Sequence, residues 1–127
     1  MILSIDINSE TPIYTQLCRQ IIRAIALKDL KEGDELPSVR SLAADIGVNL
    51  HTVSKAYNLL KADGFLIVNR RKGVVVSKPD SYRFTESYLD QLNHQLDSIV
   101  VEAIARDISD EQLNQMIQKI INEVRGE

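Results

Sequence analysis

The sequence predicts a mainly α-helical protein with one small β-hairpin. Apolar residues recur at helical spacing in five segments, whereas a single pair of β-branched runs is present and flanks a basic turn at residues 69–73. We therefore expect an N-terminal unit of three helices and a hairpin over residues 1–78. A helical pair is expected to follow over residues 79–127.

The composition is that of an ordinary soluble globular chain. Of 127 residues, 44% are hydrophobic and 26% are charged, which suits one compact domain with an accessory element. No apolar run approaches the roughly 20 residues needed to cross a bilayer. The start, MILSIDINSE, lacks the basic and apolar regions of a signal peptide. Because the only cysteine, Cys18, excludes an internal disulfide, we expect a cytoplasmic protein.

The net charge of −3 is unevenly distributed. Residues 1–78 carry 11 Lys and Arg against 8 Asp and Glu, a net charge of +3, whereas residues 79–127 carry 4 against 10, a net charge of −6. An anionic partner is therefore expected at the N-terminal part. The asymmetry is weak evidence by itself, since solvated faces vary in sign by chance.

The first helix is expected to start at Thr11-Pro12, with the threonine as N-cap and the proline at the first helical position. A short apolar-polar alternation in residues 1–10 precedes it, as in an arm or an edge strand. Residues 28–37 form a polar loop after the helix. The inward face of this helix is predicted to consist of Ile13, Leu17, Ile21, Ala24 and Ile25.

Two short helices follow, separated by a sharp turn. Ser38 and Asn49 are suited to cap their N-termini, Gly47 permits the positive φ of the turn, and Gly64 ends the second helix. The predicted inward residues are Val39, Leu42, Ala43 and Ile46, then Val53, Ala56, Tyr57 and Leu60. The second helix collects polar side chains on its other face: Asn49, His51, Thr52, Ser54, Lys55 and Asn58.

Residues 65–77, FLIVNRRKGVVVS, predict a β-hairpin whose tip carries Arg70, Arg71 and Lys72. Residues 78–81 have the composition of a linker.

The tail carries two apolar stripes that predict a helical pair. The first approximates a coiled-coil seam, because its residues step by three and four, and Ser109 with Gln112 matches a capping box before the second. Such stripes bury well when two chains meet, so we expect a homodimer; folding back onto the first unit is the alternative. The expected dimer contacts are Leu89, Leu92, Leu96, Ile99, Ala103, Leu113, Ile117, Ile120 and Val124.

Two short helices joined by a sharp turn are typical of a helix-turn-helix, whose second helix enters the major groove of DNA. Short Asn, Thr and Ser side chains fit near base edges, and lysine reaches phosphates. Arg40, on the preceding helix, is suited to anchor the DNA backbone or to contact a guanine. Each feature alone is more often a solvated surface, but their ordered combination within 41 residues is more specific.

Residues 36–76, LPSVRSLAADIGVNLHTVSKAYNLLKADGFLIVNRRKGVVV, resemble the winged helix-turn-helix domain of GntR-family bacterial transcription regulators. The resemblance extends back to Pro12, and the short two-helix tail is similar to the YtrA subfamily. The matching pieces are Leu36-Pro37-Ser38, Arg40, Leu42-Ala43, Gly47-Val48, Thr52-Val53, Ala56-Tyr57, Leu60, Gly64 and Gly73. The resemblance implies a fold, a winged helix-turn-helix, and a function, sequence-specific binding to an operator.

The resemblance also implies roles for individual residues. Arg40 matches the DNA-binding arginine of the family, and Gly73 matches a wing glycine. Two positions depart from the family pattern: Leu50, where many members have arginine, and Arg71, where the wing usually has its first glycine. The tip is therefore expected to be less tightly turned and more dependent on charge. The expected DNA contacts are Ser38, Arg40, Asn49, Leu50, His51, Thr52, Lys55, Arg70, Arg71, Lys72 and Gly73.

The function predicted is that of a homodimeric repressor on a palindromic DNA operator. A dimer supplies two recognition helices for half-sites about 34 Å apart, one turn of DNA. The alternative is a winged helix that docks onto proteins without binding DNA. A third possibility is a regulator that senses a hydrophobic compound in a groove lined by Met116 and Tyr88, so a small-molecule effector remains open.

An enzyme is not expected. Cys18, His51 and His94 are the only plausible nucleophiles or metal ligands, and no cluster has metal-ligand spacing. No Gly-rich phosphate loop is present either. We therefore expect neither a cofactor nor a metal.

Overall fold

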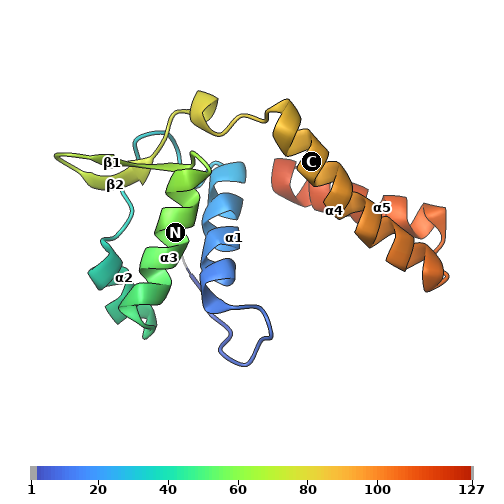
Figure 1. Cartoon of the computed structure of the whole chain (residues 1–127), viewed down its shortest axis with the longest axis horizontal. Helices are drawn as coiled ribbons and strands as arrows, with labels where there is room; N and C mark the ends of the chain where they lie inside the picture. The colour runs from blue at the N-terminus through green and yellow to red at the C-terminus, as the bar shows by residue number, and fades with distance from the viewer. Residues whose placement is uncertain (1–2, 127) are drawn as a thin grey trace. The chain divides into compact units, whose positions relative to one another are not determined.

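The computed structural model describes residues 3–126. The chain divides into two compact units with the boundary between Tyr82 and Arg83. The elements are α1 (Ile13–Ala26), α2 (Val39–Ile46), α3 (Leu50–Ala62), β1 (Leu66–Asn69), β2 (Gly73–Val76), the 3-10 turn η1 (Pro79–Ser81), α4 (Glu86–Ala105) and α5 (Asp110–Arg125) (Figure 1). The predicted class, mainly helical with one β-hairpin, is confirmed.

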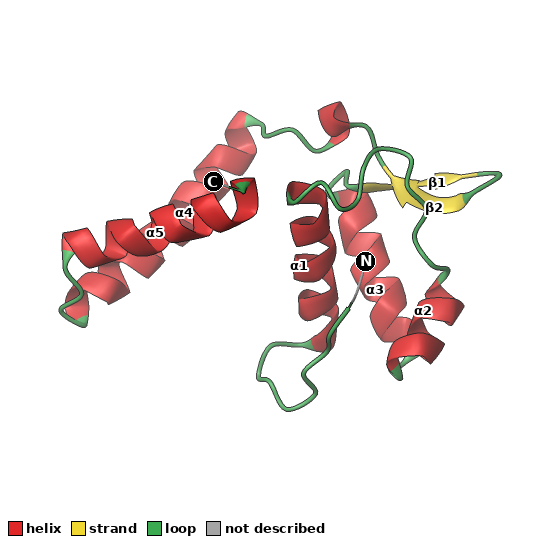
Figure 2. Cartoon of the chain, turned by 180° about the vertical axis from the view of Figure 1, so that it is seen from behind, coloured by secondary structure: helices red, strands yellow, loops and turns green. Residues whose placement is uncertain are grey.

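Helix α3 is the centre of the first unit, where it packs against α1 and α2 and leads into β1 (Figures 1 and 2). Its inward residues Val53, Ala56, Tyr57 and Leu60 are all buried, as the periodicity predicted. The Tyr57 hydroxyl donates a hydrogen bond of 2.7 Å to the carbonyl oxygen of Pro37. Burial raises the pKa of Tyr57 to about 12, so the phenol stays a donor at neutral pH and ties α3 to the start of α2.

The predicted caps of α2 and α3 are confirmed. The Ser38 hydroxyl accepts a hydrogen bond of 3.1 Å from the amide of Ser41. The Asn49 side-chain oxygen accepts one of 2.7 Å from the amide of His51. Each cap satisfies one of the backbone donors left free at a helix start.

The start of α1 differs from the prediction. Pro12, not Thr11, holds the N-cap position, and no side chain caps the helix. Pro12 keeps an extended ψ of 146°, so the helix begins one residue later than expected. The Thr11 carbonyl is used elsewhere, since it accepts a hydrogen bond of 2.9 Å from the Gln16 side chain.

Residues 3–6 form an arm along α1 rather than a strand. The Gln20 side chain accepts from the Ser4 amide and donates to the Ser4 carbonyl. Gln16 makes the same pair of hydrogen bonds with Asp6. Two glutamines one helical turn apart therefore hold the arm as a neighbouring strand would.

Strands β1 and β2 pair in antiparallel register, from Leu66 opposite Val76 to Asn69 opposite Gly73. A bridge between Glu35 and Val75 adds the loop before α2 to the outer edge of β2. The base of the hairpin is therefore anchored in the core, and its tip projects away from the helices (Figures 1 and 2).

The first unit extends four residues beyond the predicted boundary at residue 78. Gly64, with φ of +87°, lies against the backbone of Ser81, where a Cβ would overlap the carbonyl oxygen. The rings of Phe65 and Tyr82 stack with centroids 4.8 Å apart. Residues 79–81, part of the segment 78–81 that was expected to be a linker, are thus held together with Tyr82 at the end of α3. These contacts join residues 17 positions apart, Gly64 to Ser81 and Phe65 to Tyr82, so local composition does not reveal them.

The second unit consists of α4 and α5. Thr85 caps α4, and Ser109 caps α5 by accepting from the Gln112 amide at 3.1 Å, as predicted. Ala103 is the single buried residue of the two helices. Among residues 3–126, no helix combines the length and apolar character required to span a membrane.

Replacing Gly64 with alanine is expected to destabilise the first unit more than replacing Gly33. Both glycines have positive φ, which costs an alanine about 1–2 kcal/mol. Only at Gly64 does the added Cβ also strike backbone atoms, and such overpacking costs about 1–3 kcal/mol more. Urea unfolding of both variants, at one protein concentration, measures the difference. Equal losses would show that the packing of residues 79–82 on Gly64 contributes nothing.

Candidate nucleic-acid interface

The turn between α2 and α3 reverses the chain over Gly47, Val48 and Asn49. Gly47 adopts φ 71° and ψ 36°, the left-handed conformation that ends α2. The Val48 amide donates 3.0 Å back to the Ala43 carbonyl, and its side chain packs against the core. The turn is therefore fixed from both ends, which sets the direction in which α3 leaves it.

The outer face of α3 is polar and open. His51, Lys55 and Asn58 are exposed, and Thr52 and Ser54 are half-buried at its margins. One face of the helix therefore carries short side chains that can donate or accept hydrogen bonds, together with one long cation, Lys55. Such a face can hydrogen-bond to the edges of bases, and the helix N-terminus favours an anion.

Two leucines modify the predicted face. Leu50, included in the expected contact set, is half-buried and packs against the core cluster. Leu59, which the sequence reasoning missed, is 42% exposed. Because Leu59 lies one helical turn after Lys55, the sequence could have placed it on the same face of the helix.

Lys55 is held in place by α1. Its ammonium nitrogen lies 3.9 Å from the centre of the Tyr14 ring, a cation–π contact. Tyr14 is therefore a neighbour of the polar face that the sequence reasoning did not identify. No local pattern points to it, because the two residues are 41 positions apart.

Arg40 lies exposed in the first turn of α2, beside the exposed cap Ser38. Within residues 3–126, Arg40 forms no ion pair, and neither do Arg70, Arg71 and Lys72 at the tip of the hairpin. No carboxylate of the described residues therefore pairs with these four positive charges.

The hairpin tip is shaped by Asn69 and Gly73. The Asn69 side-chain oxygen accepts hydrogen bonds of 2.9 Å from the Arg71 amide and 3.1 Å from the Lys72 amide. Gly73 has φ of +84°, which closes the three-residue turn. Because Arg71 stands where a glycine was expected, we expected a less tightly turned tip. The two hydrogen bonds to Asn69 instead order the backbone of the turn. The side chain of Asn69 supplies the order.

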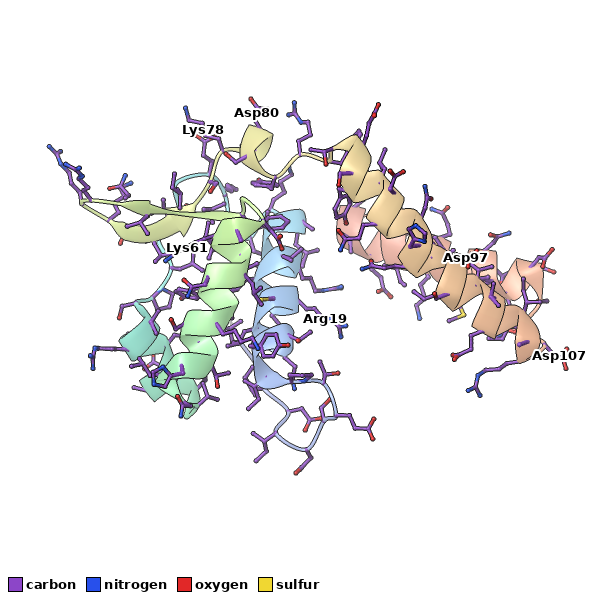
Figure 3. The ribbon with its side chains drawn as sticks, viewed as in Figure 1. Arg19, Lys61, Lys78, Asp80, Asp97 and Asp107 are labelled. Carbon is purple, nitrogen blue, oxygen red and sulfur yellow. The ribbon has the colours of Figure 1, made fainter. Side chains whose placement is uncertain are left out.

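Several further cations of the first unit lie outside the expected set. Figure 3 shows Lys61 near the end of α3 and Arg19 on α1.

The pKa of the Cys18 thiol is raised, first by burial and then by Asp63, which suits a packed thiol rather than a nucleophile. In the described part of the chain, no three His, Cys, Asp or Glu residues could hold a metal ion.

The expected dimer residues leave much apolar surface uncovered in the single chain. Ala103 is buried, and Leu92, Leu113 and Val124 are half-buried. The remaining five are exposed by 39–60%: Leu89, Leu96, Ile99, Ile117 and Ile120. Further exposed apolar side chains, absent from the predicted set, are Val101, Ile104, Met116 and Ile121.

Comparison with known proteins places this architecture in a family. Residues 13–76 match the family of bacterial regulatory proteins named gntR. The chain is 35% identical to the transcriptional repressor YtrA of Bacillus subtilis, over 98% of this chain and 95% of that protein.

Solved structures agree. YtrA from Sulfolobus acidocaldarius, a GntR-family transcription factor, is 41% identical with a TM-score of 0.64, over 83% of this chain and 99% of that one. The DNA-binding domain of AraR in complex with operator ORX1 is 27% identical with a TM-score of 0.51, over 59% of this chain and 93% of that one. The chain described here therefore belongs to the gntR family of bacterial transcription regulators.

Proposed function

We propose that this protein is a homodimeric, sequence-specific DNA-binding repressor. The observation that carries the proposal is the polar outer face of α3, set between Arg40 and a hairpin tip whose cations lack ion-pair partners within residues 3–126. The matched family and the repressor function named for Bacillus YtrA support it. A regulator of this kind works in the cytoplasm and needs no catalytic centre.

In this proposal α3 enters the major groove of DNA. The groove is about 12 Å wide and accepts one helix. Asn49, His51 and Thr52 face the base edges or the nearest phosphate at the start of α3, and Lys55 reaches the backbone from the position that Tyr14 sets. Leu50 supplies mainly packing, with its exposed part suited to an apolar contact such as a thymine methyl.

The cations outside α3 act mainly on phosphates. Arg40, in the first turn of α2, contacts the DNA backbone or a guanine, and Ser38 beside it donates from its hydroxyl. Arg70, Arg71 and Lys72 form the tip of a wing that follows the flanking backbone or minor groove, with Gly73 allowing close approach.

The tail forms the dimer. Burial of a Leu or Ile side chain contributes about 1.5–3 kcal/mol, and five of the expected contacts are exposed in the single chain. A second copy covers them by presenting the same apolar residues. Two copies present two recognition helices, which suits a palindromic operator. Bound across a promoter, such a dimer excludes other proteins from the same DNA, which is the basis of repression.

Replacing Arg40 with alanine is expected to weaken specific binding by about 1–3 kcal/mol, because one anchoring or base contact is lost. Fluorescence anisotropy measures it, with a duplex that the wild-type protein has enriched from a random pool. Arg19→Ala is the matched control, since it removes an exposed cation from α1 of the same unit. Unchanged affinity in Arg40→Ala would remove this residue from the interface.

Replacing Arg70, Arg71 and Lys72 together with alanine is expected to weaken binding to operator and scrambled duplexes alike. Each lost phosphate contact lowers the log–log salt slope by about 0.9. Asn69 and Gly73 are left intact, so the turn itself is retained. Anisotropy titrations at several salt concentrations give the slope. A loss limited to one base position would instead make the wing a reader of sequence.

Ile99→Glu and Ile120→Glu are each expected to yield a folded monomer. These side chains are 60% and 56% exposed in the single chain, so a carboxylate is tolerated there but not at an apolar interface. Gln91→Glu adds the same charge at an exposed polar position of α4 and should remain dimeric. Light scattering after size exclusion gives the mass. Dimers from both isoleucine variants would mean that another surface joins the chains.

A further inference from the structure

Tyr14 lies at the start of α1, the helix that packs alongside α3 (Figures 1 and 2). The residue is half-buried and packs against the core cluster, and the Lys55 ammonium nitrogen lies 3.9 Å from the centre of its ring. One helical turn further along α1, the Cys18 thiol donates a hydrogen bond of 3.5 Å to the Ala56 carbonyl. Two neighbouring contacts between α1 and α3 therefore hold the Tyr14 ring beside the polar face of α3.

The polar groups of Tyr14 and Lys55 are available to a ligand. Within residues 3–126, the Tyr14 hydroxyl makes no hydrogen bond and Lys55 forms no ion pair. A half-buried tyrosine keeps its apolar ring inside and its hydroxyl at the surface. The ammonium carries three donors, and the ring covers only one side of it. The hydroxyl at the edge of the ring and the ammonium over its face are therefore a pair of donors contributed by two helices.

A phosphate of the DNA backbone matches this pair of donors. Its negative charge is shared by its unesterified oxygens, so it can accept from a cation and from a hydroxyl at the same time. Lysine and tyrosine side chains are both among the groups that contact DNA phosphates. The cation–π contact also orders Lys55 before binding, which lowers the entropy cost of reaching the phosphate.

We propose that Tyr14 contacts DNA, and that its hydroxyl donates to the same backbone phosphate that Lys55 contacts. The inference rests on the proposed DNA-binding function and adds to it a residue of α1, outside the helix-turn-helix and the wing. With α3 in the major groove, α1 and α3 together hold a phosphate at the edge of that groove. Because phosphate contacts fix the register and orientation of a protein on the duplex, this contact limits how far α3 can rotate in the groove.

The test measures binding of full-length proteins to a duplex that the wild type enriches from a random pool of DNA. Tyr14→Phe keeps the ring over which Lys55 lies and removes only the hydroxyl. It should weaken binding by about fivefold to tenfold, as expected for a lost hydrogen bond to a charged group in contact with water. The log–log salt slope should not change, because a neutral hydroxyl releases no counterion. Lys55→Gln, in contrast, should lower the slope by about 0.9.

Combining the two substitutions shows whether both groups contact one phosphate. Without Lys55 that phosphate is held less closely, so removing the hydroxyl from Lys55→Gln should weaken binding by less than about threefold. Replacing single phosphates of the duplex with neutral methylphosphonates then identifies the phosphate. At one position of each half-site, the replacement should weaken the wild type strongly and both single variants much less.

Tyr82→Phe is the matched control, and it should bind as tightly as the wild type. Tyr82 is also a half-buried tyrosine of the first unit, and its ring is held by Phe65. The melting temperature of Tyr14→Phe should equal that of the wild type, because the contacts of the ring remain. A loss of affinity that accompanies a lower melting temperature would assign Tyr14 to the fold and overturn the inference.

The other outcomes separate this inference from the function on which it rests. If the wild type enriches no duplex, the proposed function fails, and this inference fails with it. If the wild type binds and Tyr14→Phe binds equally tightly, only this inference is overturned. The same conclusion holds if the losses of the two single variants multiply in the double variant, or if their methylphosphonate positions differ, because the two groups would then contact separate phosphates.

Discussion

The packing of α3 is the constraint on which the first unit depends. One face of this helix supplies Val53, Tyr57 and Leu60, all at most 1% exposed, to the core. The hydrogen bond from Tyr57 to Pro37 fixes the helix against the segment that starts α2. Because truncating a large buried side chain to alanine costs about 2–5 kcal/mol, α3 cannot rotate without losing the core. The direction of its polar face is therefore determined by what its other face buries.

Local signals in the sequence were sufficient for the elements but not for the contacts between them. Gly47, Ser38 and Asn49 predicted the turn and both caps, because those effects act within a few residues. The extension of the first unit to Tyr82, the Lys55–Tyr14 contact and the half-buried position of Leu50 were not predicted. Each depends on residues far apart in the chain, and one sequence carries no direct record of such pairs.

The hairpin shows how a departure from a family pattern can be compensated. A glycine permits a tight turn through its backbone freedom, whereas Asn69 achieves the same through its side chain, by accepting two amide hydrogen bonds. Position 71 is then free to carry arginine. Three consecutive cations thus lie on an ordered tip, and ordering them in advance lowers the entropy cost of contacting an anion.

In the proposed function the two units have different roles. The first unit contacts DNA, and the second unit joins two copies of the chain. The second unit leaves five of the nine expected dimer residues exposed in one chain, so in the proposed dimer their burial would supply the free energy that holds two copies together. In the proposed complex, that free energy would strengthen DNA binding only where both copies reach their half-sites at once.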